Sequence, residues 1–92
     1  MKEREIEQYF IRRVREAGGI QRKFVSPGHK GVPDRICCFP FGRFALVELK
    51  APGKKLRPDQ EREFAKWQAV GYAPWKIDSR ESVEVFIEYM TR

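Results

Sequence analysis

The sequence is poor in the residues on which several classes of protein depend. It has one histidine and two cysteines, and the cysteines are adjacent at positions 37 and 38. Neighbouring strand residues point to opposite faces, so Cys37 and Cys38 are badly placed to form a disulfide with each other. There is no CxxC motif and no second histidine, which argues against a zinc site. We therefore predict reduced, buried cysteines in a cytoplasmic protein.

Long apolar runs are missing as well. No segment approaches the roughly 20 apolar residues that span a bilayer. The N-terminus, MKEREIEQYF, is charged and lacks the apolar region of a secretion signal. The chain also has no repeat, linker or low-complexity tract. We predict one domain over residues 1–92, and we expect no membrane partner and no organic cofactor.

Positive charge, by contrast, is plentiful. The formal net charge is +6, while the hydrophobic fraction of 41% and the aromatic fraction of 13% are values of a globular domain. Excess positive charge favours a polyanionic partner, nucleic acid before anionic membrane, although composition alone fits a merely basic soluble domain equally well. A domain of this size buries only roughly 60–65% of its unfolded surface, so a second copy of the chain would help to cover apolar area.

The spacing of apolar residues predicts alternating helices and strands. Residues 3–17 repeat apolar side chains at helical spacing, and Gly18 and Gly19 end this helix. A second helix begins at Pro58. Strands are expected at residues 21–26, 34–39, 44–51 and 72–78. Pro74 favours an edge position for the last strand.

A last helix follows residue 78 and completes the order α-β-β-β-α-β-α. Either Asp78 or Ser79 can cap this helix, and Asp78 with Glu81 has the spacing of a capping box. Its buried stripe is expected to consist of Val83, Phe86, Ile87 and Met90. The segment 44–48 is nearly all apolar, which is typical of a strand covered on both faces.

Charged residues end two of the apolar strands. Asp34 begins one strand, and Glu48 and Lys50 lie two apart near the end of the next, so both point to the same face. The turn at residues 40–43 makes these strands antiparallel neighbours, which brings Asp34 beside Glu48. Two converging carboxylates repel each other and are costly to desolvate, and a divalent cation removes both problems. The pattern therefore predicts a Mg²⁺ or Mn²⁺ site.

Such a site suits phosphodiester hydrolysis, because the metal polarises the phosphate and lowers the pKa of a bound water. Lys50 can orient that water or offset charge that develops on the phosphate. For an isolated Glu-x-Lys pattern, a plain salt bridge at a strand end is the commoner explanation. The Pro-Asp pair upstream, the hairpin and the basic loops favour the catalytic interpretation here.

Three further polar residues belong to the candidate site. Glu3 and Glu7 lie one helical turn apart, and Glu3 leans further toward the apolar stripe, so it is our choice for a third acidic group at the metal. Glu7 is either a helper or a solvated residue that favours the helix dipole. Gln60 lies four residues before Phe64 on the inward face of its helix, within reach of Lys50 or a scissile phosphate.

Together these residues resemble a known pattern. Gly-Val-Pro-Asp at 31–34, Val-Glu-Leu-Lys at 47–50, a Gln early in the next helix and a Glu near the N-terminus resemble the VRR-Nuc domain. That domain is a branch of the PD-(D/E)XK nuclease superfamily, and the likeness extends from Glu3 to about Ile87. It implies a restriction-endonuclease-like α/β fold with a mixed central sheet flanked by helices, which agrees with the order of elements.

The resemblance also implies roles for individual residues. Asp34 and Glu48 would ligate Mg²⁺ or Mn²⁺ together with the carbonyl of Leu49. Lys50 would be the catalytic lysine. The full set of implied catalytic residues is Glu3, Asp34, Glu48, Lys50 and Gln60.

Stand-alone VRR-Nuc chains resemble this one in size and come from phages and bacteria. The resemblance implies a homodimer that cuts branched DNA, especially four-way Holliday junctions, because a two-fold pair of sites suits a two-fold junction. The alternatives are a less structure-selective nicking or flap nuclease of the same superfamily, and a non-catalytic DNA-binding module.

Cations in the loops on either side of the site are the expected contacts to the DNA backbone. The loop before Asp34 enters the site and the loop after Lys50 leaves it. The expected set is His29, Lys30, Arg35, Lys54, Lys55 and Arg57. No recognition helix or basic coiled coil is present, which favours recognition of shape and backbone over base reading.

Overall fold

The computed structural model describes all 92 residues. Its elements follow the expected order, with one additional 3₁₀ turn, η1 (Pro40–Gly42), between the second and third strands. The helices are α1 (Glu3–Glu16), α2 (Pro58–Ala69) and α3 (Arg80–Met90). The strands are β1 (Ile20–Lys23), β2 (Arg35–Phe39), β3 (Arg43–Leu49) and β4 (Trp75–Ile77). None of the helices is long and apolar enough to cross a membrane.

The four strands form one mixed sheet in the order β1-β2-β3-β4. Strands β1, β2 and β3 are antiparallel neighbours, whereas β4 runs parallel to β3 at the edge that Pro74 predicted. The turn η1 closes the β2–β3 hairpin with positive φ at Phe41 (70°) and Gly42 (71°). The register places Arg35 opposite Val47. Asp34 and Glu48, the next residue on each strand, therefore lie side by side.

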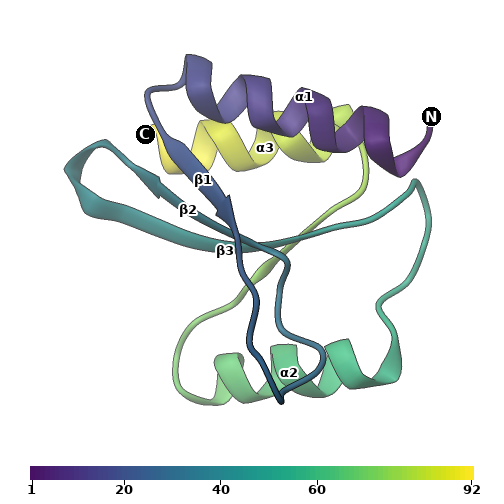
Figure 1. Cartoon of the computed structure of the whole chain (residues 1–92). Coiled ribbons are helices and arrows are strands. Elements are labelled where there is room, and N and C mark those ends of the chain that lie inside the picture. Colours follow the sequence, from purple (N-terminus) through teal and green to yellow (C-terminus); the bar gives the residue numbers. More distant parts are fainter.

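Two helices cover one face of the sheet and one covers part of the other. Helices α1 and α3 lie together on the upper face in Figure 1, and α2 lies below. The main core is entirely between the sheet and the α1–α3 layer, and α2 contributes no residue to it. Phe86 of α3 lies at its centre, with ring centroids 5.1 to 5.9 Å from Trp75, Phe39 and Phe10. The predicted stripe of α3 is buried, with Val83, Phe86, Ile87 and Met90 all in the core.

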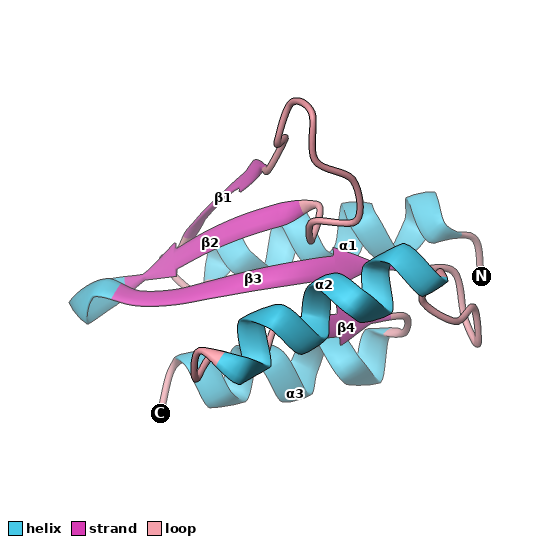
Figure 2. Cartoon of the chain, turned by 90° about the horizontal axis from the view of Figure 1, so that it is seen from below, coloured by secondary structure: helices cyan, strands magenta, loops and turns pink.

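Helix α2 is attached to the sheet in a different way. Its buried residues are Gln60, Glu63 and Phe64, two of which are polar. The loop between β1 and β2 packs tightly against its first turn, since a Cβ added at Gly31 would lie 2.6 Å from the carbonyl oxygen of Asp59. Viewed from below in Figure 2, α2 crosses β3 and β4 and leaves β1 and β2 uncovered. The α2 layer therefore holds polar groups against the sheet and adds little apolar core.

The structure decides between the two caps that the sequence offered for α3. The hydroxyl of Ser79 accepts a hydrogen bond from the Ser82 N–H at 3.0 Å and caps α3, so the Asp78–Glu81 capping box does not form. Ser79 is one residue closer than Asp78 to the observed start of the helix at Arg80, so its hydroxyl is the one in the N-cap position.

The edge strands are shorter than the sequence predicted, and one cysteine is less buried than expected. Strand β1 ends at Lys23 because the chain leaves the sheet to reach α2, and β4 is reduced to three residues. Cys37 is buried in the core as expected, but Cys38 is only half-buried, since it points to the sheet face that α2 leaves open; both thiols are free.

Candidate active site

The β2–β3 hairpin brings Asp34 and Glu48 together, as the sequence predicted. The main-chain N–H of Asp34 donates to Glu48 Oε1 at 3.2 Å. In return, the N–H of Leu49 donates to Asp34 Oδ1 at 3.3 Å. Each carboxylate is thus fixed by the backbone of the other strand, and the main chain of Leu49 lies at the same point.

Glu48 is surrounded by buried polar groups. Gln60 Nε2 donates to Glu48 Oε2 at 2.9 Å, and Lys50 Nζ lies 3.6 Å from the same oxygen. Glu48, Lys50 and Gln60 are 5%, 4% and 3% exposed, so three polar side chains share one desolvated site. Gln60 is itself oriented by the first turn of α2, where its Oε1 accepts from the Arg57 N–H at 2.9 Å. The inward position predicted for Gln60 is confirmed.

The electrostatics of the pair show a shortage of positive charge. Burial, with the charge of Glu48 and a smaller contribution from Glu3, raises the pKa of Asp34 from 3.8 to about 7. Burial also raises the pKa of Glu48, although the charge of Lys50 opposes this. One ammonium does not offset two partly desolvated carboxylates, and an additional cation would let both ionise at neutral pH.

The donors at the site fit a hard divalent cation. Carboxylate and main-chain oxygens are the ligands that Mg²⁺ and Mn²⁺ prefer, and Mg²⁺ commonly uses one or two carboxylates with several waters. No group of three or more His, Cys, Asp or Glu side chains is close enough to hold a metal. Asp34 and Glu48 would therefore act as a two-carboxylate site completed by main-chain oxygen and water.

The two candidate acids of α1 have different surroundings. Glu3 is exposed at the start of the helix, and its charge contributes to the raised pKa of Asp34. Glu7 Oε2 instead accepts from Arg35 Nη2 at 2.7 Å. Of the two, Glu3 is the acid whose charge raises the pKa of Asp34, whereas Glu7 is paired with Arg35.

Arg35 occupies a position that the sequence did not predict. It is 5% exposed, and besides Glu7 it donates to Gln21 Oε1 at 2.8 Å. Its Nε is buried without a partner. Because strand alternation turns Arg35 to the α1 side of β2, it serves as a buried ion pair between helix and sheet. It is not an exposed cation, and we remove it from the expected DNA contacts.

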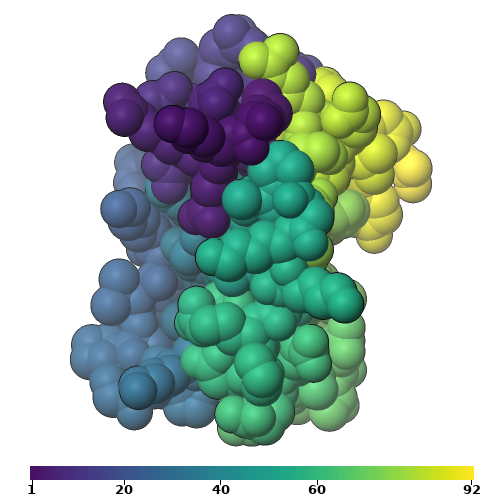
Figure 3. Space-filling view, turned by 90° about the vertical axis from the view of Figure 1, so that its right-hand side faces the viewer, coloured from purple at the N-terminus to yellow at the C-terminus, as the bar shows by residue number.

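The other predicted contacts lie in the two loops that frame the site. Lys30, Lys54, Lys55 and Arg57 are exposed. In Figure 3 the start of α1 (purple), the β1–β2 loop (blue) and the β3–α2 loop (teal) meet on one face. Arg57 also forms a salt bridge with Asp59, in which Arg57 Nε lies 3.2 Å from Asp59 Oδ1.

His29 contacts Glu63, a buried residue that the sequence analysis did not identify. Its Nε2 lies 2.7 Å from Oε2 of Glu63, which is 8% exposed. Glu63 follows Gln60 by three residues and so lies on the same face of α2, a spacing that could have identified it. The contact fixes the β1–β2 loop over α2 and leaves half of the His29 side chain exposed.

A half-buried Asp34 and a buried Glu48 lie beside a buried lysine on a mixed sheet between helices, which is the arrangement expected of the restriction-endonuclease-like fold. Comparison with known proteins agrees. The chain is similar to a solved VRR-Nuc domain, with a TM-score of 0.87 and 30% identity over 97% of each chain. It is also 46% identical over 81 residues to “Putative nuclease p44” of Acyrthosiphon pisum secondary endosymbiont phage 1, which covers 88% of this chain and 87% of that relative. No protein-family model matches the sequence. The chain belongs to the VRR-Nuc family and is a nuclease of that type.

Proposed function

We propose that the chain is a metal-dependent, structure-selective DNA endonuclease that works as a homodimer and resolves four-way junctions. The observation that carries the proposal is the pair of half-buried Asp34 and buried Glu48, which lies beside Lys50 and is short of positive charge. A protein that only binds DNA gains nothing from placing two acids where a phosphate must approach, because the acids repel it.

The residues of the site take distinct parts in hydrolysis. Asp34, Glu48 and the carbonyl of Leu49 would hold Mg²⁺ or Mn²⁺, which when bound polarises the phosphate and lowers the pKa of a water. Lys50 places an ammonium beside this point, where it orients the attacking water or offsets charge on the phosphate. Gln60 keeps Glu48 aimed at the same point through its 2.9 Å hydrogen bond. Glu3 supplies additional negative charge at the exposed edge of the metal site, near Asp34.

The framing loops provide the path for the DNA backbone. Lys30 on one side and Lys54, Lys55 and Arg57 on the other are exposed, and His29 is half-exposed beside Lys30. Flexible exposed cations bind phosphates without reading sequence, which suits an enzyme that selects DNA by shape. The proposed place of action is the cytoplasm of a bacterial or phage-infected cell.

Support for a homodimer comes from the face of the sheet that α2 leaves open (Figure 2). Ile20 and Ile36 lie on this face with 59% and 37% of their surface exposed, and Phe41 at the hairpin tip is 95% exposed. Arg22, opposite Ile36 in the register, shares this face with them. Exposed apolar side chains gathered on an open sheet face beside polar ones are typical of a surface that meets another protein. A second copy would bury it and provide the second nick that a junction requires.

The test compares cleavage of a four-way junction, a flap and a linear duplex of the same arm sequences, with Mg²⁺ or Mn²⁺ and with EDTA. The proposal expects paired nicks in the junction, little cleavage of the duplex, and none with EDTA. Asp34→Ala should bind the junction without cutting it. Equal cleavage of all three substrates would favour the less selective nuclease, and salt-dependent binding without any cleavage would leave only a DNA-binding module.

A further inference from the structure

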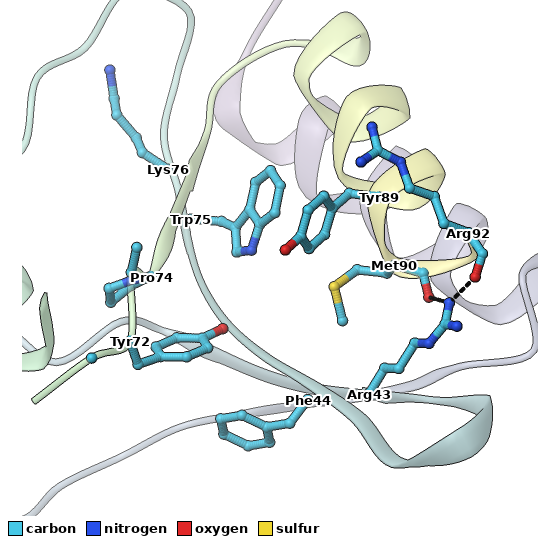
Figure 4. Close-up of a pocket in the computed structure, with 11 residues that line it drawn as sticks. Arg43, Phe44, Tyr72, Pro74, Trp75, Lys76, Tyr89, Met90 and Arg92 are labelled. Carbon is cyan, nitrogen blue, oxygen red and sulfur yellow. Dashed lines mark hydrogen bonds between the residues drawn. The ribbon is translucent and has the colours of Figure 1, made fainter.

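A cavity that no catalytic residue lines lies between the edge of β3 and the end of α3 (Figure 4). Its volume is about 1000 Å³. Strand β4 pairs only with residues 47–49 of β3. The first half of β3 therefore has no neighbouring strand on the side that faces away from β2. The cavity occupies the place that a longer β4 would fill.

Aromatic rings form two walls of this cavity. Phe44 and Tyr72 lie on one side, with ring centroids 5.9 Å apart, and Trp75 and Tyr89 lie on the other, 5.4 Å apart. Phe44 is 45% exposed and Tyr89 is 53% exposed, so their rings are accessible. Exposed rings arranged in this way offer stacking surfaces for a flat, uncharged ring system.

The charged groups of the cavity have one sign. Arg43, Lys76 and Arg92 line it and no acidic side chain does. Two of these cations also pair with carboxylates outside the cavity, Lys76 with Asp78 at 3.4 Å and Arg92 with Glu88 at 3.0 Å. Arg43 Nη1 is held by main-chain oxygens of Met90 and Arg92, which fixes its guanidinium near the mouth (Figure 4). Aromatic walls with a cationic rim fit a ligand that combines a base with a phosphate.

Main-chain groups add a hydrogen-bonding edge. The N–H of Leu46 points away from β2 and donates to the Tyr72 hydroxyl at 2.8 Å. Alternate strand residues direct their N–H and C=O to the same side, so Phe44 presents both groups to the cavity. With Leu46 already engaged, this edge is too short to bind an added peptide strand, but one donor and one acceptor suffice for the edge of a single base.

We propose that this cavity binds a nucleotide that is released from pairing at the branch point of the DNA substrate, and so favours branched DNA over an intact duplex. Its position fits this role, because Lys76 lies opposite Glu48 in the β3–β4 register. Phe44 precedes Glu48 by four strand residues, roughly 13 Å, a length that a few nucleotides can bridge. The inference rests on the proposed function only in taking DNA as the substrate.

The test measures binding of a six-nucleotide oligothymidylate without metal, so it does not depend on cleavage. The chain has two tryptophans, and Trp67→Phe leaves Trp75 in the cavity wall as the only one. Stacking should quench its fluorescence. In this background, Phe44→Ala and Tyr89→Ala should each weaken binding about 5- to 100-fold. Tyr89→Phe keeps the ring and should bind normally.

Val85→Ala is the matched control, since Val85 is on the same helix as Tyr89, is 61% exposed and lies outside the cavity. Its affinity should equal that of the parent. The inference is overturned if the two cavity variants bind as tightly as the control, if the oligonucleotide does not bind at all, or if Tyr89→Ala changes the oligomeric state and leaves affinity intact. Failure of junction cleavage with normal oligonucleotide binding would contradict the proposed function and leave the cavity assignment standing.

Discussion

Replacing Asp34 by asparagine should make the metal-free protein more stable while it abolishes cleavage. Folding raises the pKa of this carboxyl from 3.8 to about 7, chiefly through burial. A difference of about 3 pH units corresponds to at most about 4 kcal/mol, and because Asp34 is only partly buried we expect about 1–3 kcal/mol after solvent screening. Asparagine keeps an oxygen for the Leu49 N–H but carries no charge.

The pH dependence follows from the direction of this shift. An acid whose pKa rises on folding costs no stability below its unfolded pKa, and the cost grows between about pH 4 and pH 7, where only the unfolded chain ionises freely. Asp34→Asn should therefore melt about 5–15 °C above the wild type at pH 7.5 in EDTA, and the gap should narrow at pH 5. The assay is thermal unfolding followed by circular dichroism.

The matched control is Glu88→Gln, which removes one negative charge from an exposed position on α3. Its melting temperature should stay within a few degrees of the wild type at both values of pH. If Asp34→Asn melts below the wild type at pH 7.5, or if its advantage is the same at pH 5, the pair is not short of positive charge and our reasoning about the site fails.

Four other predictions address the remaining parts of the account. Lys50→Ala should abolish junction cleavage with little change in the Kd for the junction, measured by gel shift; normal cleavage would mean that Lys50 has no catalytic part. Lys54→Ala with Lys55→Ala should reduce the slope of log Kd against log salt by about 1.8, as expected for two lost phosphate contacts. Gly31→Ala should lower the free energy of unfolding by roughly 1–3 kcal/mol and impair cleavage, because the new Cβ would collide with the main chain of Asp59 and the backbone φ is 88°. Gly28→Ala is the control for backbone strain alone, since Gly28 also has positive φ but has open space around it. Ile20→Lys should convert a dimer into a monomer in light scattering, and an unchanged mass would exclude the open sheet face as the dimer surface.

Much of the site could be predicted because it depends on strand geometry. Alternation put Glu48 and Lys50 on one face, and a short turn forced Asp34 beside Glu48, with no information needed beyond the order of residues. Gln60 was placed in the same way, from its spacing to Phe64. The core stripe of α3 also followed from helical periodicity, since burial of Val83, Phe86, Ile87 and Met90 requires only one apolar face.

The misplaced residues depend on contacts between distant segments. Arg35 is one residue from Asp34, yet it points to the opposite face and meets Glu7 of α1, a partner that local sequence does not reveal. Glu63 is buried because the β1–β2 loop crosses α2 and brings His29 to it. The cavity at the edge of β3 exists because β4 stops after three residues, a length that propensity does not fix.

The central claim is that Asp34 and Glu48 share a divalent cation, and diffraction from a crystal soaked in Mn²⁺ tests it most directly. We predict an anomalous peak contacted by one carboxylate oxygen from each residue and by the carbonyl oxygen of Leu49. The absence of a peak between these groups in a crystal that cuts DNA when dissolved in the same buffer, or a peak held by other residues, would contradict the account.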